Sequence, residues 1–218
     1  MSARDPALAS RLDAGLHALQ LSVPAPAREQ LLAYLEQLHK WNQAYNLSGI
    51  RELRDMLDLH LLDSLALAPF IDTSPIADVG TGAGLPGIPL AICLPEKHFR
   101  LIDSNSKKTR FIFQTAALLG LRNVEVIHCR AEDYESESRV AIVTSRAFAS
   151  LRDFVLRCDH MLANDGKFLA MKGLVPRDEI AALPAQYEVA AIHPLSLPGS
   201  SHVRHVLDIR RSAATAAS

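Results

Sequence analysis

The chain has 218 residues, 49% of them hydrophobic, and a formal net charge of −1 at pH 7. This length allows one domain with an extension and a real core, and the charge excludes a bulk polycation. The cysteines are widely spaced with no C-x-x-C pair, so we expect no disulfide framework and no metal, and Cys129 and Cys158 indicate buried packing. The charged N-terminus and the lack of a bilayer-length apolar run predict a cytoplasmic protein without a membrane span.

Residues 1–73 have helical periodicity and predict an N-terminal helical extension. One leucine stripe, Leu8 to Leu19, predicts a first helix, and a second stripe, Leu31 to Tyr45, predicts another. Residues 51–70 predict one or two further helices. Within this region, the aromatic pair formed by Trp41 and Tyr45 either stacks on RNA bases or belongs to the core, which is the commoner place for helical aromatic residues.

His60 lies in the same region, in the run His-Leu-Leu-Asp-Ser. It has no second histidine or cysteine at a spacing that metal ligands use, which argues against a metal site. We therefore expect a hydrogen-bonded interior histidine near the cofactor.

From residue 74 to residue 211, strand and helix patterns alternate, which predicts parallel strands joined by right-handed crossovers with helices on both faces. No helix separates the last two strands, so a hairpin with an antiparallel strand is expected there. The result is an α/β, doubly wound, Rossmann-like mixed sheet of about seven strands, as in S-adenosylmethionine-dependent (class I) methyltransferases. Residues 212–218 predict a frayed tail. The predicted strands are 75–80, 98–103, 123–128, 140–145, 167–172, 186–192 and 203–209, and the predicted helices are 87–94, 106–120, 150–163 and 176–183.

A glycine-rich loop follows the first of these strands, in the run Asp-Val-Gly-Thr-Gly-Ala-Gly-Leu-Pro-Gly that begins at Asp78. Glycine allows a sharp turn and a ligand lying close to the backbone. The weak dinucleotide fingerprint is present from Gly82 onward, but Gly80, Gly82 and Gly84 together with Asp78 form a tighter pattern. The loop therefore predicts a nucleoside-type cofactor at the carboxyl end of a parallel strand.

Two residues of the loop favour S-adenosylmethionine over a dinucleotide. Asp78 places a carboxylate at the strand end, which suits a cationic sulfonium ligand better than a pyrophosphate. Pro86 lacks the backbone N–H that a phosphate would use at the start of the next helix. A dinucleotide, and a tight turn without any ligand, remain as alternatives.

Three later positions fit the same cofactor. Asp103 ends the second strand, where a carboxylate accepts ribose hydroxyls, although it also suits a helix cap. Ala131 and Glu132 follow the third strand and suit an adenine ring and its amine, unless Glu132 is only an exposed acid among others. Arg146 closes the fourth strand, where it either positions cofactor or substrate or pairs with a carboxylate.

Basic residues form two groups that predict an RNA-binding rim near the cofactor. One group opens the helix after Asp103 and the other lies near the C-terminus; runs of charge are also typical of solvated faces. The groups comprise Lys107, Lys108 and Arg110 with Lys97 and Arg100 just before them, and Arg204, His205, Arg210 and Arg211.

Several motifs in one order resemble the RsmG family, also called GidB, of small-subunit ribosomal RNA guanine-N7 methyltransferases. The resemblance covers residues from about 30 to 173. It rests on the runs Trp41–Ser48, His60–Leu65, Asp78–Gly87, Leu101–Ser104 with Lys107 and Lys108, Arg130–Glu132, Ser145–Ala147 and Met171–Gly173. Where the family more often has Lys-Arg, this chain has Lys107-Lys108, which keeps the charge but not the bidentate fork of arginine.

The resemblance implies a methyltransferase that carries methyl from S-adenosylmethionine to N7 of a guanine (position 527) in the 530 loop of 16S rRNA. It implies that Gly80, Leu85, Ala131, Glu132 and Arg146 bind the cofactor. The expected partner is 16S rRNA or the small ribosomal subunit, and the expected state is a monomer.

Because guanine N7 has a lone pair at neutral pH, no general base is needed, and orientation of the reactants carries the catalysis. Arg146 and Lys172 are the residues we expect to orient the guanine or its phosphate. Two other functions remain open: a methyltransferase for a small molecule or protein, and a non-catalytic ribosome-assembly factor that keeps the cofactor pocket. A dinucleotide oxidoreductase is a more distant alternative.

Overall fold

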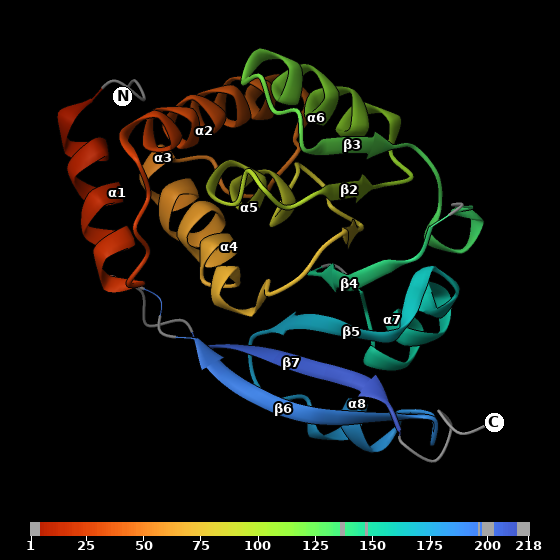
Figure 1. Ribbon diagram of the computed structural model, residues 1–218. Coiled ribbons are helices and arrows are strands. Elements are labelled where there is room, and N and C mark those ends of the chain that lie inside the picture. The colour runs from red at the N-terminus through yellow and green to blue at the C-terminus, as the bar shows by residue number, and fades with distance from the viewer. Residues whose placement is uncertain (1–4, 136–137, 147, 196, 198–202, 213–218) are drawn as a thin grey trace.

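The computed structural model describes residues 5–135, 138–146, 148–195, 197 and 203–212. Within them, seven strands form one mixed sheet in the order β3-β2-β1-β4-β5-β7-β6 (Figure 1). Strands β1 to β5 run parallel to one another, and β7 runs antiparallel to both β5 and β6. The strands are β1 (Ile76–Val79), β2 (Phe99–Ile102), β3 (Val124–Ile127), β4 (Val140–Ser145), β5 (Leu162–Lys172), β6 (Tyr187–Leu195) and β7 (Arg204–Arg211). The predicted mixed sheet is confirmed.

The helices precede the sheet or connect its strands. The α-helices are α1 (Pro6–Ala18), α2 (Ala25–Tyr45), α3 (Leu53–Met56), α4 (Asp63–Leu65), α5 (Gly87–Cys93), α6 (Ser106–Leu118), α7 (Leu151–Cys158) and α8 (Arg177–Ala181). A π-helix, η1 (Leu57–Leu62), joins α3 to α4, and the 3-10 helices are η2 (Ala68–Phe70), η3 (Ala131–Asp133) and η4 (Asp159–Met161).

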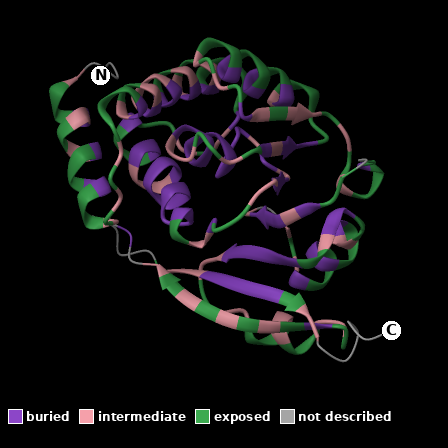
Figure 2. Cartoon of the chain, viewed as in Figure 1, coloured by how far each residue is buried: buried purple, intermediate pink, exposed green. Residues whose placement is uncertain are grey.

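Two hydrophobic cores lie on the two faces of the sheet. Because side chains alternate along a strand, Ile76 packs into the first core and Ala77 into the second. The first core joins α1, α2 and the η1 region to α5 and α6, and the second lies beneath α7. Figure 2 shows the central strands buried along their length, whereas β6 alternates between exposed and partly buried residues. The N-terminal helices therefore cover one face of the sheet and share its core.

The largest departure from the predicted elements lies between β4 and β5. The expected helix over 150–163 ends at Cys158, and β5 begins at Leu162 rather than at residue 167. The pairing of β4 with β5 jumps from Val140–Leu162 to Ile142–Lys167. This irregularity absorbs the polar run 163–166 within the strand, and such a run has no strand periodicity of its own.

The region 51–70 also differs from a plain helix. The predicted leucines Leu57, Leu61 and Leu65 are all buried, but the backbone passes through a π-helix between them. A single π-helical turn accommodates one extra residue inside an α-helix, and such turns are frequent at functional sites. Leucine spacing alone carries no signal for such an insertion.

Candidate functional site

The glycine loop turns back over the carboxyl end of β1. Gly80, Gly82 and Gly84 all have positive φ, at +67°, +63° and +86°. Side chains other than glycine rarely adopt this conformation, so the loop requires glycine at all three positions. At Gly82 a Cβ would meet nothing closer than 3.9 Å, so the backbone of the loop there is open to a ligand.

Asp78 supports this loop from beneath. Its side chain is fully buried, and Oδ2 accepts hydrogen bonds from the Thr81 hydroxyl at 2.6 Å and the Gly87 N–H at 2.9 Å. Burial raises the pKa of this carboxyl to about 6, although these two bonds and Arg146 oppose the rise. Oδ1 has no hydrogen-bond partner among the described residues. Asp78 thus braces the loop here, and its direct contact with a cationic ligand stays a prediction.

A cleft opens beside the loop, where the carboxyl ends of β1, β2 and β3 meet. It is lined by Val79, Gly80, Ile102, Asp103, Ser104, Lys108, Cys129, Arg130, Ala131, Glu132, Phe148 and Arg157. The lining includes Gly80, Asp103, Ala131 and Glu132 of the predicted cofactor residues. Leu85 lies instead in the first core.

Asp103 connects this cleft to the loop. Oδ2 accepts the Gly82 N–H at 2.8 Å, and Oδ1 accepts the Asn105 N–H at 2.8 Å. The cap of α6 is Asn105, whose side chain accepts from Lys107 and Lys108 N–H groups, so Asp103 is not that cap. Each oxygen of an ionised carboxylate has a second lone pair, which leaves Asp103 able to accept ribose hydroxyls from the cleft.

The far wall of the cleft mixes predicted and unexpected residues. Glu132 on η3 is half-exposed and forms an ion pair with Arg157 at 3.2 Å, so it is more than an isolated surface acid. Cys129, which we expected to be buried, is only partly buried and lines the cleft, because β3 ends two residues before it. Phe148 was not anticipated; its position just after the fourth strand, at the cofactor edge, was the available signal.

Arg146 leaves the end of β4 next to the glycine loop. The neighbouring Ser145 hydroxyl donates to the Val79 carbonyl at 2.7 Å, which fixes the two strand ends together. The Arg146 guanidinium turns toward the N-terminal helices, where Nη1 lies 3.2 Å from Asp63 Oδ2 and 3.1 Å from Ser64 Oγ. The alternative that Arg146 pairs with a carboxylate is therefore observed, with its side chain still 22% exposed.

Lys172 leaves the sheet on the opposite face. Its Nζ lies 2.9 Å and 3.2 Å from the two carboxylate oxygens of Glu179 on α8. Glu179 also accepts the Leu151 N–H at the start of α7, within the layer that covers the second core. The structure thus separates Arg146 and Lys172, and a shared role in orienting the acceptor stays a prediction.

His60 is buried on η1, close to Arg146. Its Nε2 lies 2.6 Å from the Ser48 hydroxyl, which in turn accepts the Ile50 N–H. Its Nδ1 lies 3.2 Å from the Leu59 carbonyl, which can only accept, so in the neutral ring the proton is on Nδ1 and Nε2 accepts from the Ser48 hydroxyl. Burial and the nearby Arg146 lower the pKa of His60 to about 4. The predicted hydrogen-bonded interior histidine is confirmed.

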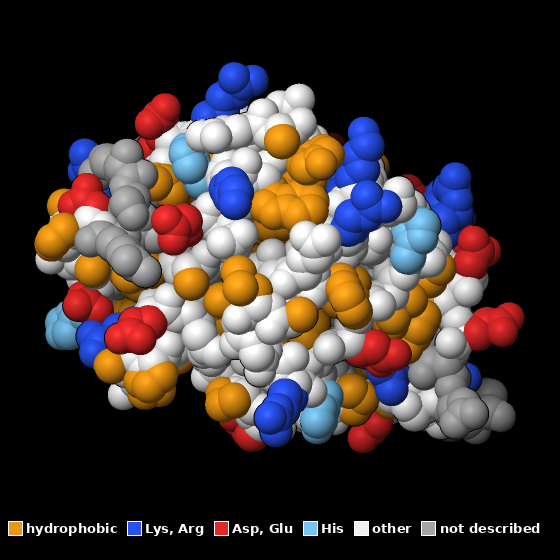
Figure 3. Space-filling view, turned by 90° about the horizontal axis from the view of Figure 1, so that it is seen from above, with side chains coloured by type: hydrophobic (Ala, Val, Ile, Leu, Met, Phe, Trp, Pro, Cys, Tyr) orange, Lys and Arg blue, Asp and Glu red, His pale blue; other side chains and the backbone are white. Residues whose placement is uncertain are grey.

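The basic residues lie at both ends of the strands, some at the carboxyl ends beside the cleft and others at the amino ends. Lys107 and Arg110 are exposed on α6 at the cleft edge, and Lys108 lines the cleft. Figure 3 looks down on the α2–α6 side and shows basic and hydrophobic side chains together on this face. On α6, Phe113 and Leu118 are 66% and 64% exposed.

Other members of the two predicted basic groups lie elsewhere. Lys97 donates to the Asp72 carbonyl, and Arg100 contacts Ser138 and Glu125 on the amino-terminal side of the sheet. Because β7 is antiparallel, it starts at the cleft edge with Arg204 and ends with Arg210 and Arg211 at the opposite edge. The expectation of one continuous rim was therefore wrong for Lys97, Arg100, Arg210 and Arg211.

Among the described residues, no three His, Cys, Asp or Glu side chains are placed to hold a metal ion. No helix in the described part of the chain is long and apolar enough to cross a membrane.

A family model described as rRNA small subunit methyltransferase G (GidB) matches residues 27–207. A curated protein named ribosomal RNA small subunit methyltransferase G, from Marinobacter nauticus, is 52% identical over 91% of this chain and 92% of its own length. Among solved structures, TrmN from Thermus thermophilus has a TM-score of 0.59 at 17% identity, over 78% of this chain and 53% of that chain. The glycopeptide N-methyltransferase MtfA, solved with S-adenosyl-L-homocysteine, has a TM-score of 0.61 at 9% identity, over 70% and 87% of the two chains. These two likenesses confirm the predicted Rossmann-like methyltransferase fold.

Proposed function

Since the chain belongs to the rRNA small subunit methyltransferase G family, we propose that it transfers methyl from S-adenosylmethionine to guanine N7 in the 530 loop of 16S rRNA. The observation that carries the proposal is the glycine loop with its three positive-φ glycines, one of which, Gly82, donates its N–H to Asp103 at the rim of the cleft. The family resemblance drawn from the sequence motifs is confirmed by the match over residues 27–207.

The residues of the cleft fit the cofactor. Asp103 offers acceptor lone pairs for ribose hydroxyls, and Ala131 with Phe148 provides an apolar surface for an adenine ring. Pro86 precedes α5 and contributes no N–H, which leaves the amino end of that helix poorly suited to a pyrophosphate. When bound, S-adenosylmethionine supplies an electrophilic methyl group on a sulfonium.

The chain's own part in the reaction is orientation. Guanine N7 carries its lone pair at neutral pH, so the protein needs no residue that removes a proton from it. Arg146 sits beside the loop with a fixed guanidinium, and it would orient the guanine by donating to its acceptor atoms. Placing the reacting atoms in line contributes roughly 7–11 kcal/mol of barrier reduction in favourable cases.

Lys107, Lys108 and Arg110 would bind RNA phosphates next to the cleft, and Arg204 would extend this contact. The target base must leave its stack to reach the cleft, which favours a looped RNA. We propose a monomer that works in the cytoplasm, where ribosomal subunits are its substrate.

The test is a methyl-transfer assay with labelled S-adenosylmethionine and two acceptors, unmethylated small-subunit particles and deproteinised rRNA. Labelled RNA is then cleaved by borohydride and aniline, which cut at N7-methylguanine. Label with one cut in the 530 loop is the expected result. Binding of cofactor and RNA without transfer would favour a non-catalytic assembly factor, and turnover without RNA would favour a small-molecule or protein acceptor.

A further inference from the structure

A buried carboxylate joins three distant parts of the chain beside the site. The side chain of Asp63 on α4 is 2% exposed and lies between two arginines. Oδ2 lies 3.2 Å from Arg146 Nη1 at the end of β4, and Oδ1 accepts from Arg204 Nε at 2.9 Å at the start of β7. The predicted functions of the cleft use Arg146 and Arg204, but they assign nothing to Asp63.

We propose that Asp63, fixed by Arg204, is a positioning residue that holds the Arg146 guanidinium in place for the methyl acceptor. The inference rests on the proposed function, because Arg146 acts there on the guanine. Asp63 itself would not touch the substrate, since its side chain is enclosed by the two arginines and the helix.

The contacts leave the guanidinium little freedom. Ser64 Oγ lies 3.1 Å from Nη1, and the Leu59 carbonyl accepts from Nη2 at 3.5 Å, so three groups of one helical segment surround the terminal nitrogens. Ser64 in turn donates to the His60 carbonyl at 2.6 Å. A charge-assisted contact has the directionality needed to fix a planar guanidinium.

A second set of bonds fixes the helical segment itself. Asn42 on α2 donates to the Ile50 carbonyl at 2.8 Å and accepts the Ser48 N–H at 2.7 Å, and Ser48 bonds His60. This network holds the π-helix that carries Leu59 and His60 against α2. Residues far from the cleft therefore determine where Arg146 lies.

The second ion pair, between Arg204 and Asp63, explains how one carboxylate binds two arginines. The Arg204 contact occupies Oδ1 and turns Oδ2 toward Arg146. If Arg204 were absent, Asp63 would be able to rotate and meet Arg146 with either oxygen. We thus expect Arg204→Gln to weaken the placement of Arg146 while leaving the buried carboxylate paired.

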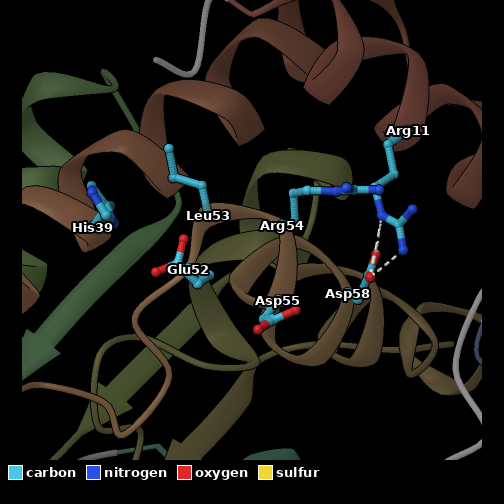
Figure 4. A pocket seen from close by; sticks show the side chains of 7 residues that line it. All are labelled: Arg11, His39, Glu52, Leu53, Arg54, Asp55 and Asp58. Carbon is cyan, nitrogen blue, oxygen red and sulfur yellow. Dashed lines mark hydrogen bonds and ion pairs between the residues drawn. The ribbon is translucent and has the colours of Figure 1, made fainter. Parts of the chain in front are cut away.

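The experiment compares two carboxylate-to-amide variants in the full chain. Asp63→Asn removes the charge that holds Arg146 and keeps the side-chain shape. Asp58→Asn is the matched control: Asp58 lies on η1, its side chain is 12% exposed, and it forms an ion pair with Arg11 of α1 (Figure 4). Arg11 and Asp58 line a separate hollow with His39, Glu52 and Asp55, away from the cleft.

The measurements are single-turnover transfer to unmethylated small-subunit particles, with saturating cofactor and with enzyme in saturating excess over the particles, and the Kd for S-adenosylhomocysteine. We expect Asp63→Asn to slow transfer about tenfold to a hundredfold and to raise the Kd by a smaller factor, because small displacements of a positioning group have effects of this size on the reaction rate. Asp58→Asn should transfer at the wild-type rate. Because the rate is measured per active site at saturation, a loss of folded protein alone does not reproduce this pattern.

If Asp63→Asn transfers as fast as Asp58→Asn, the positioning role is overturned. Should Asp63→Asn fail to fold, Arg204→Gln decides the same question from its single-turnover rate at saturation, because a lost phosphate contact weakens RNA binding without slowing the saturated rate. A slowed saturated rate is expected, and a wild-type rate overturns the inference. A wild-type protein that methylates no RNA would instead overturn the proposed function, and this inference with it.

Discussion

Arg146 and Lys172 leave neighbouring strands on opposite faces of one sheet, and each is held by a carboxylate. On the first face, Asp63 is 2% exposed and shares its charge between two arginines. On the second face, Glu179 is 28% exposed and pairs with one lysine. Removing one partner of a buried ion pair strongly lowers the free energy of unfolding, whereas an exposed ion pair contributes little to it. We infer that the loss of a charge disturbs the positions of the neighbouring side chains more on the first face than on the second.

The largest expected effect is the loss of the buried carboxylate. Asp63→Ala leaves two arginine side chains without their anion, and we expect it to lower the free energy of unfolding by about 3–5 kcal/mol. The measurement is urea unfolding followed by circular dichroism. Glu179→Ala serves as the comparison on the second face, where we expect a decrease of about 1 kcal/mol or less. Equal losses in the two variants would remove the difference between the faces.

The next effect is a pH dependence of the free energy of unfolding, which comes from His60 on the first face. Because the folded-state pKa of His60 is about 4 and the ordinary value is 6.5, the unfolded chain binds more protons between these values. The contribution of His60 to stability is thus present above pH 6.5 and is lost as the pH falls toward 4. Between pH 7 and pH 5 we expect the wild type to lose about 2 kcal/mol more than His60→Gln does. The comparison is needed because Asp78, whose pKa is raised to about 6, titrates in the same range with the opposite sign in both proteins.

Urea unfolding of both proteins at the two pH values gives this difference. His17→Gln, at an exposed histidine of α1, is the control and should keep the wild-type slope. A wild-type slope in His60→Gln would show that the buried ring does not stay neutral in the folded protein.

A smaller effect concerns the space beneath the glycine loop. A Cβ on Gly87 would lie 2.1 Å from Leu101 Cδ2 and 2.9 Å from Asp78 Oδ2. We expect Gly87→Ala to reduce the free energy of unfolding by about 1–3 kcal/mol through overpacking. Gly49→Ala is the control, since no atom lies within 4 Å of its Cβ position. Thermal unfolding of the two variants measures the contrast, and equal midpoints would contradict the tight packing.

The smallest effect is expected at Lys172. Its pair with Glu179 is partly exposed, so Lys172→Met should change the free energy of unfolding by less than about 1 kcal/mol. Single-turnover transfer separates its two possible roles. A wild-type rate in Lys172→Met would restrict acceptor positioning to the first face, and a strongly slowed rate would extend it to the second.

Much of the fold follows from local pattern. The order of strands and helices after residue 74, and the antiparallel hairpin at the end, are predicted because alternation and turn residues are properties of adjacent positions. Leu57, Leu61 and Leu65 are correctly placed in the core for the same reason. The π-helix and the early start of β5 are not predicted, because both are set by packing against elements far away in the chain.

The site divides in the same way. Gly80, Asp103, Ala131 and Glu132 are found at the cleft because each lies in the segment that follows a strand whose carboxyl end faces the cleft. Which carboxylate pairs with Arg146 is not predicted, since its partners Asp63 and Ser64 lie more than 80 residues earlier in the sequence. Arg146 and Lys172 leave opposite faces of the sheet because of the register between β4 and β5, which the sequence of one chain leaves open.

The position of β7 between β5 and β6 has a consequence for synthesis of the protein. As the chain leaves a ribosome, Asp63 and Arg146 emerge well before Arg204, and β5 has no partner on its outer side until β7 is made. The shared carboxylate is therefore completed by one of the last segments to appear. A nascent chain of this protein would contain the whole glycine loop before it contained the second arginine that pairs with Asp63.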